Sequence, residues 1–229
     1  GCPDAYISPA RRRTDMAYRF SKLPTGWTRT TGCDLGAFKA GGQAGTSIAA
    51  LKCLLAVSLQ ADFHTRTAAV SYNDFELLTG LSRPMISKGL RMLADMQILT
   101  IAGDHAHRYT VNEVGDNYWA KLPFDLLRLR LKELGNRGAI RLAALKIYVI
   151  LIARRSNKFD WTALTYEQIV EHTGVRRADV RAGLSELYSL GLLHADMVHP
   201  EDGKPAFRAY FIRGLTVADP RLGKVPDAV

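Results

Sequence analysis

An internal repeat constrains the fold of this chain more than any other feature of its sequence. Residues 47–101 align with residues 141–195 at a constant offset of 94 positions, without a gap, and 13 of the 55 aligned pairs are identical. The identities cluster as an Ala-Leu-Lys run, a Thr-Gly pair and a Gly-Leu pair, and the tripeptide Lys-Leu-Pro recurs upstream at 22–24 and 121–123. Two copies of one structural unit are therefore expected within the 229 residues.

The first copy opens with a helix and a short strand. Apolar residues recur at helical spacing from residue 47 to about residue 62, with Thr46 or Ser47 available as the N-cap. The short apolar stretch 68–70 can then pair as an edge strand.

A second helix and a sharp turn follow the strand. Ser71 is placed to cap this helix, and Phe75, Leu77 and Leu78 supply its apolar face. Gly80 can adopt the left-handed conformation that ends a helix and turns the chain.

The third helix starts directly after that turn, with Ser82 as its expected N-cap and Pro84 in its first turn. Its expected buried stripe consists of Ile86, Leu90 and Leu93. Gly89 lies beside this stripe, where a glycine permits a close helix crossing. Residues 98–101 and 108–111 then predict a β-hairpin.

The second copy repeats this order of three helices and a hairpin. The expected ranges are 142–154, 166–172 and 177–190 for the helices and 192–212 for the hairpin, whose loop at 199–205 is longer and rich in turn formers. Helices followed by a hairpin are typical of a winged helix. The sequence thus predicts an α+β fold, mainly α with small β-hairpins, built as two tandem winged-helix domains.

These ranges predict the domain organisation of the chain. A basic N-terminal arm or extension (1–45) precedes the first winged helix (46–112), a helical linker (113–140) leads to the second winged helix (141–213), and a C-terminal tail (214–229) follows.

The third helix of the first copy carries a cationic face that suits DNA. Arg83, Ser87 and Arg91 recur at every fourth position, with Lys88 beside them, and no acidic residue occurs between Glu76 and Asp95. In helix-turn-helix proteins the start and outer face of this helix enter the major groove, where arginine binds guanine edges and phosphates. We therefore predict DNA contacts by Ser82, Arg83, Ser87, Lys88 and Arg91.

The second copy carries a weaker version of this face. Arg176, Arg177 and Arg181 occupy the corresponding region, but Asp179 and Glu186 interrupt it. The two copies are therefore expected to contribute unequally to binding.

Further cations lie around the hairpins and near the N-terminus. Arg108 borders the first hairpin loop, and Lys204 and Arg208 lie in and after the second, where all three could reach phosphates or the minor groove. Arg11, Arg12 and Arg13 could form an arm along DNA or a solubilising tail.

Overall charge and composition agree with a polyanionic partner. The formal net charge is +9, which favours nucleic acid or an anionic membrane. The longest apolar run, 147–153, is far shorter than the roughly 20 residues of a membrane span, and the start of the sequence lacks the apolar segment of a secretory signal. We expect a cytoplasmic protein that does not bind membranes.

Motifs for cofactors, metals or catalysis are weak. The glycine-rich segment 41–47 lacks the lysine of a phosphate-binding loop and reads as a linker into an N-cap. His105 and His107 lack partner ligands, and the cysteines Cys2, Cys33 and Cys53 match no disulfide or zinc pattern. No enzyme activity, cofactor or metal is expected.

The segments 72–83 and 85–93 resemble the helix-turn-helix of winged-helix regulators and replication proteins. The tandem arrangement over about residues 18–213 is similar to plasmid theta-type replication initiators, and the first copy looks like phage origin-binding replication proteins. This resemblance implies binding to repeated origin sequences of double-stranded DNA, a monomer–dimer equilibrium and contacts with replication proteins.

Two other functions remain open at the level of sequence. A transcriptional repressor that binds operators would use the same helices and hairpins. Tandem winged helices also act as protein-interaction modules, although such a module is expected to be acidic, and this chain is basic.

Overall fold

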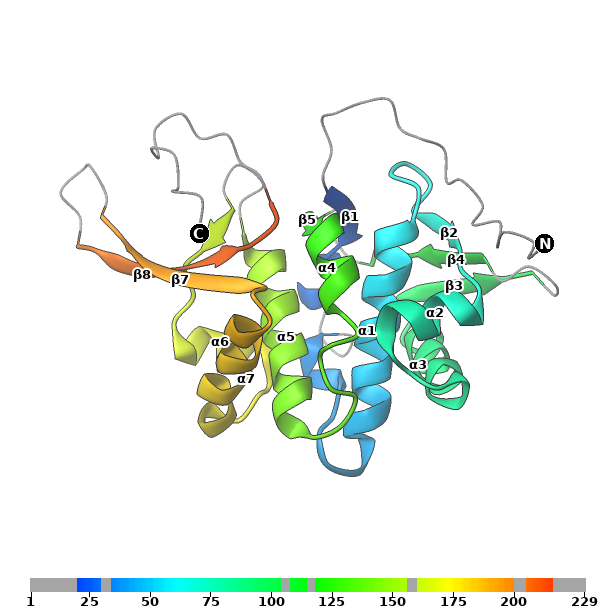
Figure 1. Cartoon of the computed structure of the whole chain (residues 1–229), viewed down its shortest axis with the longest axis horizontal. Coiled ribbons are helices and arrows are strands. Elements are labelled where there is room, and N and C mark those ends of the chain that lie inside the picture. Colours follow the sequence, from blue (N-terminus) through cyan, green and yellow to red (C-terminus); the bar gives the residue numbers. More distant parts are fainter. Residues whose placement is uncertain are drawn as a thin grey trace, which may run out of the picture.

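The chain folds into helices and small antiparallel sheets, so the predicted α+β class is confirmed (Figure 1). The computed structural model describes residues 20–29, 34–103, 108–114, 118–155, 160–199 and 205–215. Arg11, Arg12, Arg13, Lys204, Cys2, Cys33, His105 and His107 lie outside the described residues.

The first unit has the predicted order of elements. It consists of α1 (Ala44–Gln60), β2 (Thr67–Ala69), α2 (Tyr72–Thr79), α3 (Arg83–Asp95), β3 (Leu99–Ala102) and β4 (Arg108–Val111). Its antiparallel sheet has the strand order β2-β4-β3. The expected N-cap of α1 was wrong, because the helix starts at Ala44 and the Ser47 hydroxyl donates instead to the Lys39 carbonyl, 2.8 Å away.

The second unit repeats this order at the offset seen in the sequence. It consists of α5 (Ala139–Arg154), β6 (Trp161–Thr162), α6 (Tyr166–Thr173), α7 (Arg177–Ser189), β7 (Leu193–Val198) and β8 (Phe207–Ile212), with the strand order β6-β8-β7. The bounds of α6 and α7 are those of α2 and α3 moved by 94 residues. The sequence repeat is therefore also a repeat of structure.

The segments expected to be an arm and a linker are largely integrated into the fold. The first contains β1 (Phe20–Pro24) and the short 3-10 helices η1 (Gly26–Arg29), η2 (Leu35–Ala37) and η3 (Gly41–Gln43); the second contains β5 (Trp119–Pro123) and α4 (Phe124–Arg130). Leu23, Trp27, Leu35 and Phe38 are fully buried. The first segment thus contributes these side chains to the core, and within the described part of the linker the α-helical residues are those of α4 and the first two of α5.

The repeated Lys-Leu-Pro tripeptides lie on the two strands of a central ribbon, in which their lysines are opposite each other. Strands β1 and β5 run antiparallel, with Lys22 opposite Lys121. The ammonium of Lys22 lies 5.3 Å from the centre of the Trp119 ring, and that of Lys121 lies 4.8 Å from the centre of the Phe20 ring. These cation–π contacts hold both lysines at the ribbon.

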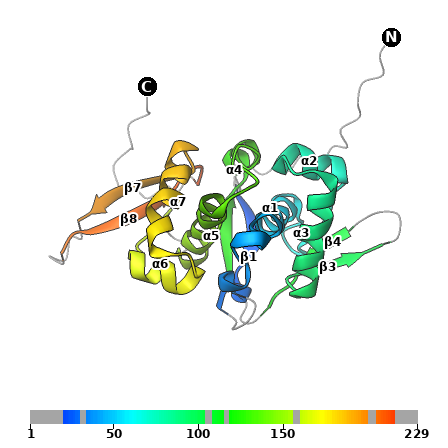
Figure 2. The same cartoon turned by 90° about the horizontal axis from the view of Figure 1, so that it is seen from below.

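Helices α1 and α5 form the centre of the molecule. Figures 1 and 2 show them side by side, with α2 and α3 on one flank, α6 and α7 on the other, and the hairpins β3–β4 and β7–β8 at opposite ends. One continuous hydrophobic cluster includes buried residues of both helices and both flanks. The two units consequently share a core.

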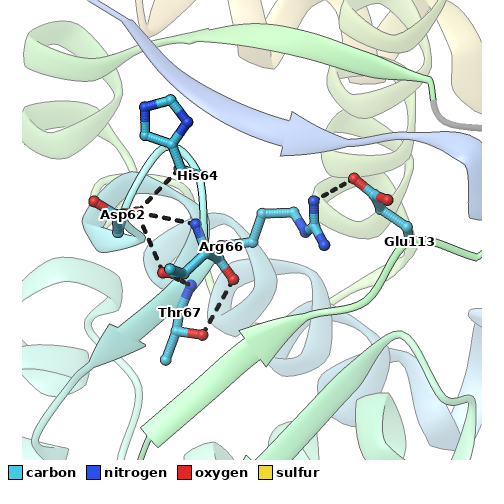
Figure 3. A network of polar contacts seen from close by, with 6 residues as sticks. Asp62, His64, Arg66, Thr67 and Glu113 are labelled. Carbon is cyan, nitrogen blue, oxygen red and sulfur yellow. Dashed lines mark hydrogen bonds and ion pairs between the residues drawn. The ribbon is translucent and has the colours of Figure 1, made fainter.

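The turn between α1 and β2 is fixed by a polar network (Figure 3). The Asp62 carboxylate accepts hydrogen bonds from the backbone N–H groups of Thr65 (2.9 Å) and His64 (3.0 Å), which lower its pKa. Arg66 has a positive φ of 56° and forms an ion pair with Glu113 beyond β4. This network fixes the turn that leads from α1 into the edge strand β2.

Candidate nucleic-acid interface

The helix pairs α2–α3 and α6–α7, with the turns between them, are built alike in the two units. Ser71 and Asp74 form a capping box at the start of α2, and Thr165 and Gln168 form one at the start of α6. Both helices end at a left-handed glycine, Gly80 with φ 66° and Gly174 with φ 63°. The predicted cap and break of the second helix are therefore confirmed, and α3 and α7 each start three residues after the glycine.

A buried lysine supports each of these turns. The Lys52 ammonium donates to the carbonyl oxygens of Thr79 (2.8 Å) and Leu134 (2.5 Å) and to Oδ1 of Asn136 (2.6 Å). Its equivalent Lys146 donates to the Thr173 carbonyl at 2.9 Å. The bonds to Thr79 and Thr173 satisfy helix-end carbonyls that would otherwise be buried without a donor.

Helices α3 and α7 pack against α1 and α5 through glycine. A Cβ atom at Gly89 would lie 2.7 Å from the backbone of Ala49 and Ala50, which confirms the predicted close crossing. Ile86, Leu90 and Leu93 are buried on the same side, as expected. Leu77 departs from its predicted core position on α2 with 73% of its surface exposed.

The opposite face of α3 carries the predicted cations in two different states. Arg83 is tied to its own unit, because its guanidinium donates to Asn73 Oδ1 (2.6 Å) and to Glu76 Oε2 (3.3 Å). Lys88 and Arg91 are exposed, and within the described residues neither forms an ion pair. Ser87 is half-buried, and Ser82 is exposed at the N-cap position without a side-chain capping bond.

Acidic partners occupy two of the predicted cations of the second unit. Arg176 forms a two-pronged ion pair with Asp179, at 2.7 and 3.0 Å, which raises the pKa of Arg176. Arg177 pairs with Glu167, and the hydrogen bond lowers the pKa of that carboxyl group. Asp179 is predictable from the sequence of α7, whereas Glu167 and Glu76 are not, since each lies on the preceding helix and meets its arginine only after the turn.

The second unit has a cleft between α7 and its hairpin. The cleft measures about 530 Å³ and is lined by Tyr166, Arg181, Leu184, Ser185, Tyr188 and Arg208. Arg181 and Arg208, predicted separately, are thereby brought to one site with hydroxyl groups around them. Guanidinium and hydroxyl donors in a shallow cleft can bind a phosphate. In the first unit, the equivalent positions on α3 carry Ser87 in place of Arg181 and Arg91 in place of Ser185.

The remaining predicted hairpin cation, Arg108, is exposed at the start of β4, opposite Ala69 and Ala102. It therefore lies in the middle strand of the first sheet, at the loop end of the β3–β4 hairpin. Arg208 holds a similar place in β8, opposite Met197.

The described part of the chain was also searched for metal sites and for helices that could span a membrane. No group of three or more His, Cys, Asp or Glu residues there could hold a metal ion. One described helical stretch, Gly41–Gln60, is long and apolar enough to cross a membrane, but 78% of its most apolar window is buried. This burial matches a core helix, which α1 is in this fold.

The chain was compared with protein-family models, with curated proteins and with solved structures, and none of the three comparisons gave a match.

Proposed function

We propose that this protein binds double-stranded DNA through two winged-helix modules, with α3 and α7 as the recognition helices. The observation that carries this proposal is the two-sided character of α3. One side is buried against α1 through Gly89, and the other exposes Lys88 and Arg91 without acidic partners among the described residues. A cationic helix face beside a β-hairpin is the surface that winged helices apply to the major groove and the flanking phosphates.

The two modules are proposed to make different contributions to DNA binding. Lys88 and Arg91 are available to read base edges in the first module, whereas Arg176 and Arg177 already bind Asp179 and Glu167. The cleft with Arg181 and Arg208 suits a backbone phosphate. The second module would thus contribute mainly affinity and position, and the first mainly sequence discrimination.

The direct test is a salt titration of binding to sheared duplex DNA, followed by fluorescence anisotropy. Binding should weaken steeply with salt, because each neutralised phosphate contributes a slope of about −0.9 in log K against log salt. The absence of binding at low salt would contradict the proposal. Footprinting on a selected duplex should show protection over about 20 base pairs, which corresponds to two successive major grooves.

Alanine variants locate the binding surface. Replacing Lys88 and Arg91 together should weaken binding at least about tenfold and leave thermal stability unchanged, since neither side chain forms an ion pair among the described residues. Adding Arg83→Ala should weaken binding further by a smaller factor, because Arg83 already donates to Asn73 and Glu76. The control Arg128→Ala removes a positive charge from α4 and should have little effect.

Origin binding in the manner of a replication initiator is the biological role that we propose, on the strength of the tandem resemblance. A repressor would use the same surface. The two roles differ in their targets, because an initiator requires iterated sites and a repressor a single operator. Footprints at several regularly spaced copies of the selected sequence, located in the source DNA, would support the initiator, and one isolated footprint the repressor.

A further inference from the structure

The pairing of the central ribbon relates the two units by a two-fold axis. Strands β1 and β5 carry the same tripeptide and run antiparallel, with Lys22 opposite its counterpart Lys121. On either side of this pair, Ser21 lies opposite Leu122 and Leu23 opposite Ala120. Rotation by 180° about an axis through the lysine pair therefore exchanges the two strands.

Packing outside the ribbon obeys the same exchange. The segment before α5 covers the end of α2, where a Cβ on Gly80 would lie 3.5 Å from the Lys132 carbonyl. The segment before α1 covers the end of α6 in return, where a Cβ on Gly174 would lie 3.5 Å from the Cα of Gly36. Contacts that recur when the partners are exchanged are isologous, which is the property of a two-fold interface.

The same relation applies to the two proposed recognition helices. Helices α3 and α7 lie on opposite flanks of the α1–α5 pair (Figure 2). A duplex has local two-fold axes perpendicular to its own axis, and modules related by such an axis read their half-sites in opposite directions. Units related by a translation would instead read both half-sites in the same direction.

We propose that the DNA target of this chain consists of two half-sites in inverted orientation, read by α3 and α7 of a single chain. This inference rests on the proposed function and adds the polarity of the target. The native half-sites differ in sequence, because α3 and α7 differ at their exposed positions. The sequence of a native target therefore does not reveal the inverted orientation, and the experiment requires two half-sites of equal sequence.

A variant with equal recognition helices makes the inversion visible. The α3 residues are moved to the equivalent positions of α7 by Arg176→Ser, Asp179→Met, Arg181→Ser, Ala182→Lys and Ser185→Arg. Selection from a random duplex library should then recover an inverted repeat of one half-site. A synthetic duplex with that half-site inverted should bind at least about tenfold more tightly than one with it repeated directly, because reversal mismatches several base pairs.

The reciprocal variant serves as the matched control. It moves the α7 residues to α3 by Ser82→Arg, Met85→Asp, Ser87→Arg, Lys88→Ala and Arg91→Ser. It should also select an inverted repeat, now of the second half-site. Recovery of direct repeats by either variant would overturn the inference and leave the proposed function intact.

A measurement on native recognition helices keeps the inference testable if these variants do not fold. Ser82→Cys and Arg176→Cys label equivalent positions, in a background with Cys2→Ser and Cys33→Ser and with the buried Cys53 retained. A DNA-cleaving reagent attached to each cysteine should cut the selected native target at places that exchange under a dyad, with the two strands swapping roles. Cuts related by a simple shift along one strand would overturn the inference.

Failure of the proposed function has a different signature. The unlabelled native chain would then bind no duplex at low salt, and the inference would fall with it. Binding by the native chain together with shifted cuts or direct repeats would refute only the two-fold reading of the target.

Discussion

The buried lysines Lys52 and Lys146 occupy equivalent places but differ in what they bind. Burial lowers the pKa of each to about 8. The three acceptors around Lys52 match the three donors of an ammonium group, and two of them belong to the segment before α5. Lys52 therefore links the two units, whereas the bond from Lys146 to Thr173 stays within its own unit.

Substitution by methionine should expose this difference. Both variants remove a buried lysine of similar pKa, so the free energy gained by no longer burying an ammonium group is similar in the two. Lys52→Met leaves more buried acceptors without a donor, and each costs about 1–3 kcal/mol. We expect Lys52→Met to lower the free energy of unfolding by about 1–3 kcal/mol more than Lys146→Met, measured by urea denaturation. Equal losses would contradict the linking role of Lys52.

The same lysines predict a rise in stability with pH. Between pH 8 and pH 9 the native lysines release protons that the unfolded chain still holds, so the unfolded state binds more protons and the free energy of unfolding increases. Above pH 9 the Cys53 thiol opposes this trend, because burial raises its pKa and only the unfolded chain ionises it.

The measurement is urea denaturation at pH 8.0, 8.5 and 9.0. The double variant Lys52→Met/Lys146→Met should show a slope smaller than that of the native chain by about 2 kcal/mol per pH unit, about 1 kcal/mol for each lysine. A native slope that survives in the double variant would assign the rise to other groups.

At the scale of elements, the crossings of α3 over α1 and of α7 over α5 form a matched pair. A Cβ at Gly89 would meet backbone atoms of Ala49 and Ala50 at 2.7 Å. A Cβ at Gly183 would first meet the flexible end of Ile147, at 3.0 Å, and the Ala144 nitrogen at 3.1 Å. The first crossing is therefore the tighter one.

Alanine at the two glycines should have unequal effects. Gly89→Ala forces two helices apart and should cost about 1–3 kcal/mol, beyond the small gain in helix propensity. Gly183→Ala should cost clearly less, since the Ile147 side chain can move. Thermal denaturation of both variants gives the comparison, and a larger loss for Gly183→Ala would contradict it.

The helices of each unit could be predicted from sequence because their signals are local. The capping residue Ser71, the break at Gly80 and the stripe of α3 lie within a few turns of each other, and the bounds of α2 and α3 follow from them. The repeat then carries these bounds to α6 and α7. The β1–β5 ribbon could not be predicted in this way, because Lys22 and Lys121 meet across about a hundred residues.

The candidate interface could likewise be predicted in part from the sequence. The cationic positions of α3 and α7 follow from helical periodicity, but the partners that occupy Arg83 and Arg177 come from the preceding helix. Leu77 shows the opposite error, since an apolar residue in a helical pattern was assigned to the core and lies at the surface.

At the scale of the whole molecule, the shared core predicts cooperative unfolding. One hydrophobic cluster runs through α1, α5 and both flanks, and each unit is covered by a segment that leads into the other. We expect a single two-state transition, with coincident curves from far-UV circular dichroism and tryptophan fluorescence. Two separate transitions would show that the units are independent domains, as tandem winged helices joined by a simple linker would be.

The exchange of covering segments also affects how the protein acquires its fold during synthesis. The first unit is complete only when β5 and residues 134 and 136 are available, because they pair with β1 and accept hydrogen bonds from Lys52. Domains usually fold in turn as they leave the ribosome. Here the leading half must wait for the start of the trailing half, so a stalled or truncated chain would expose the unfinished α1 surface to chaperones and proteases.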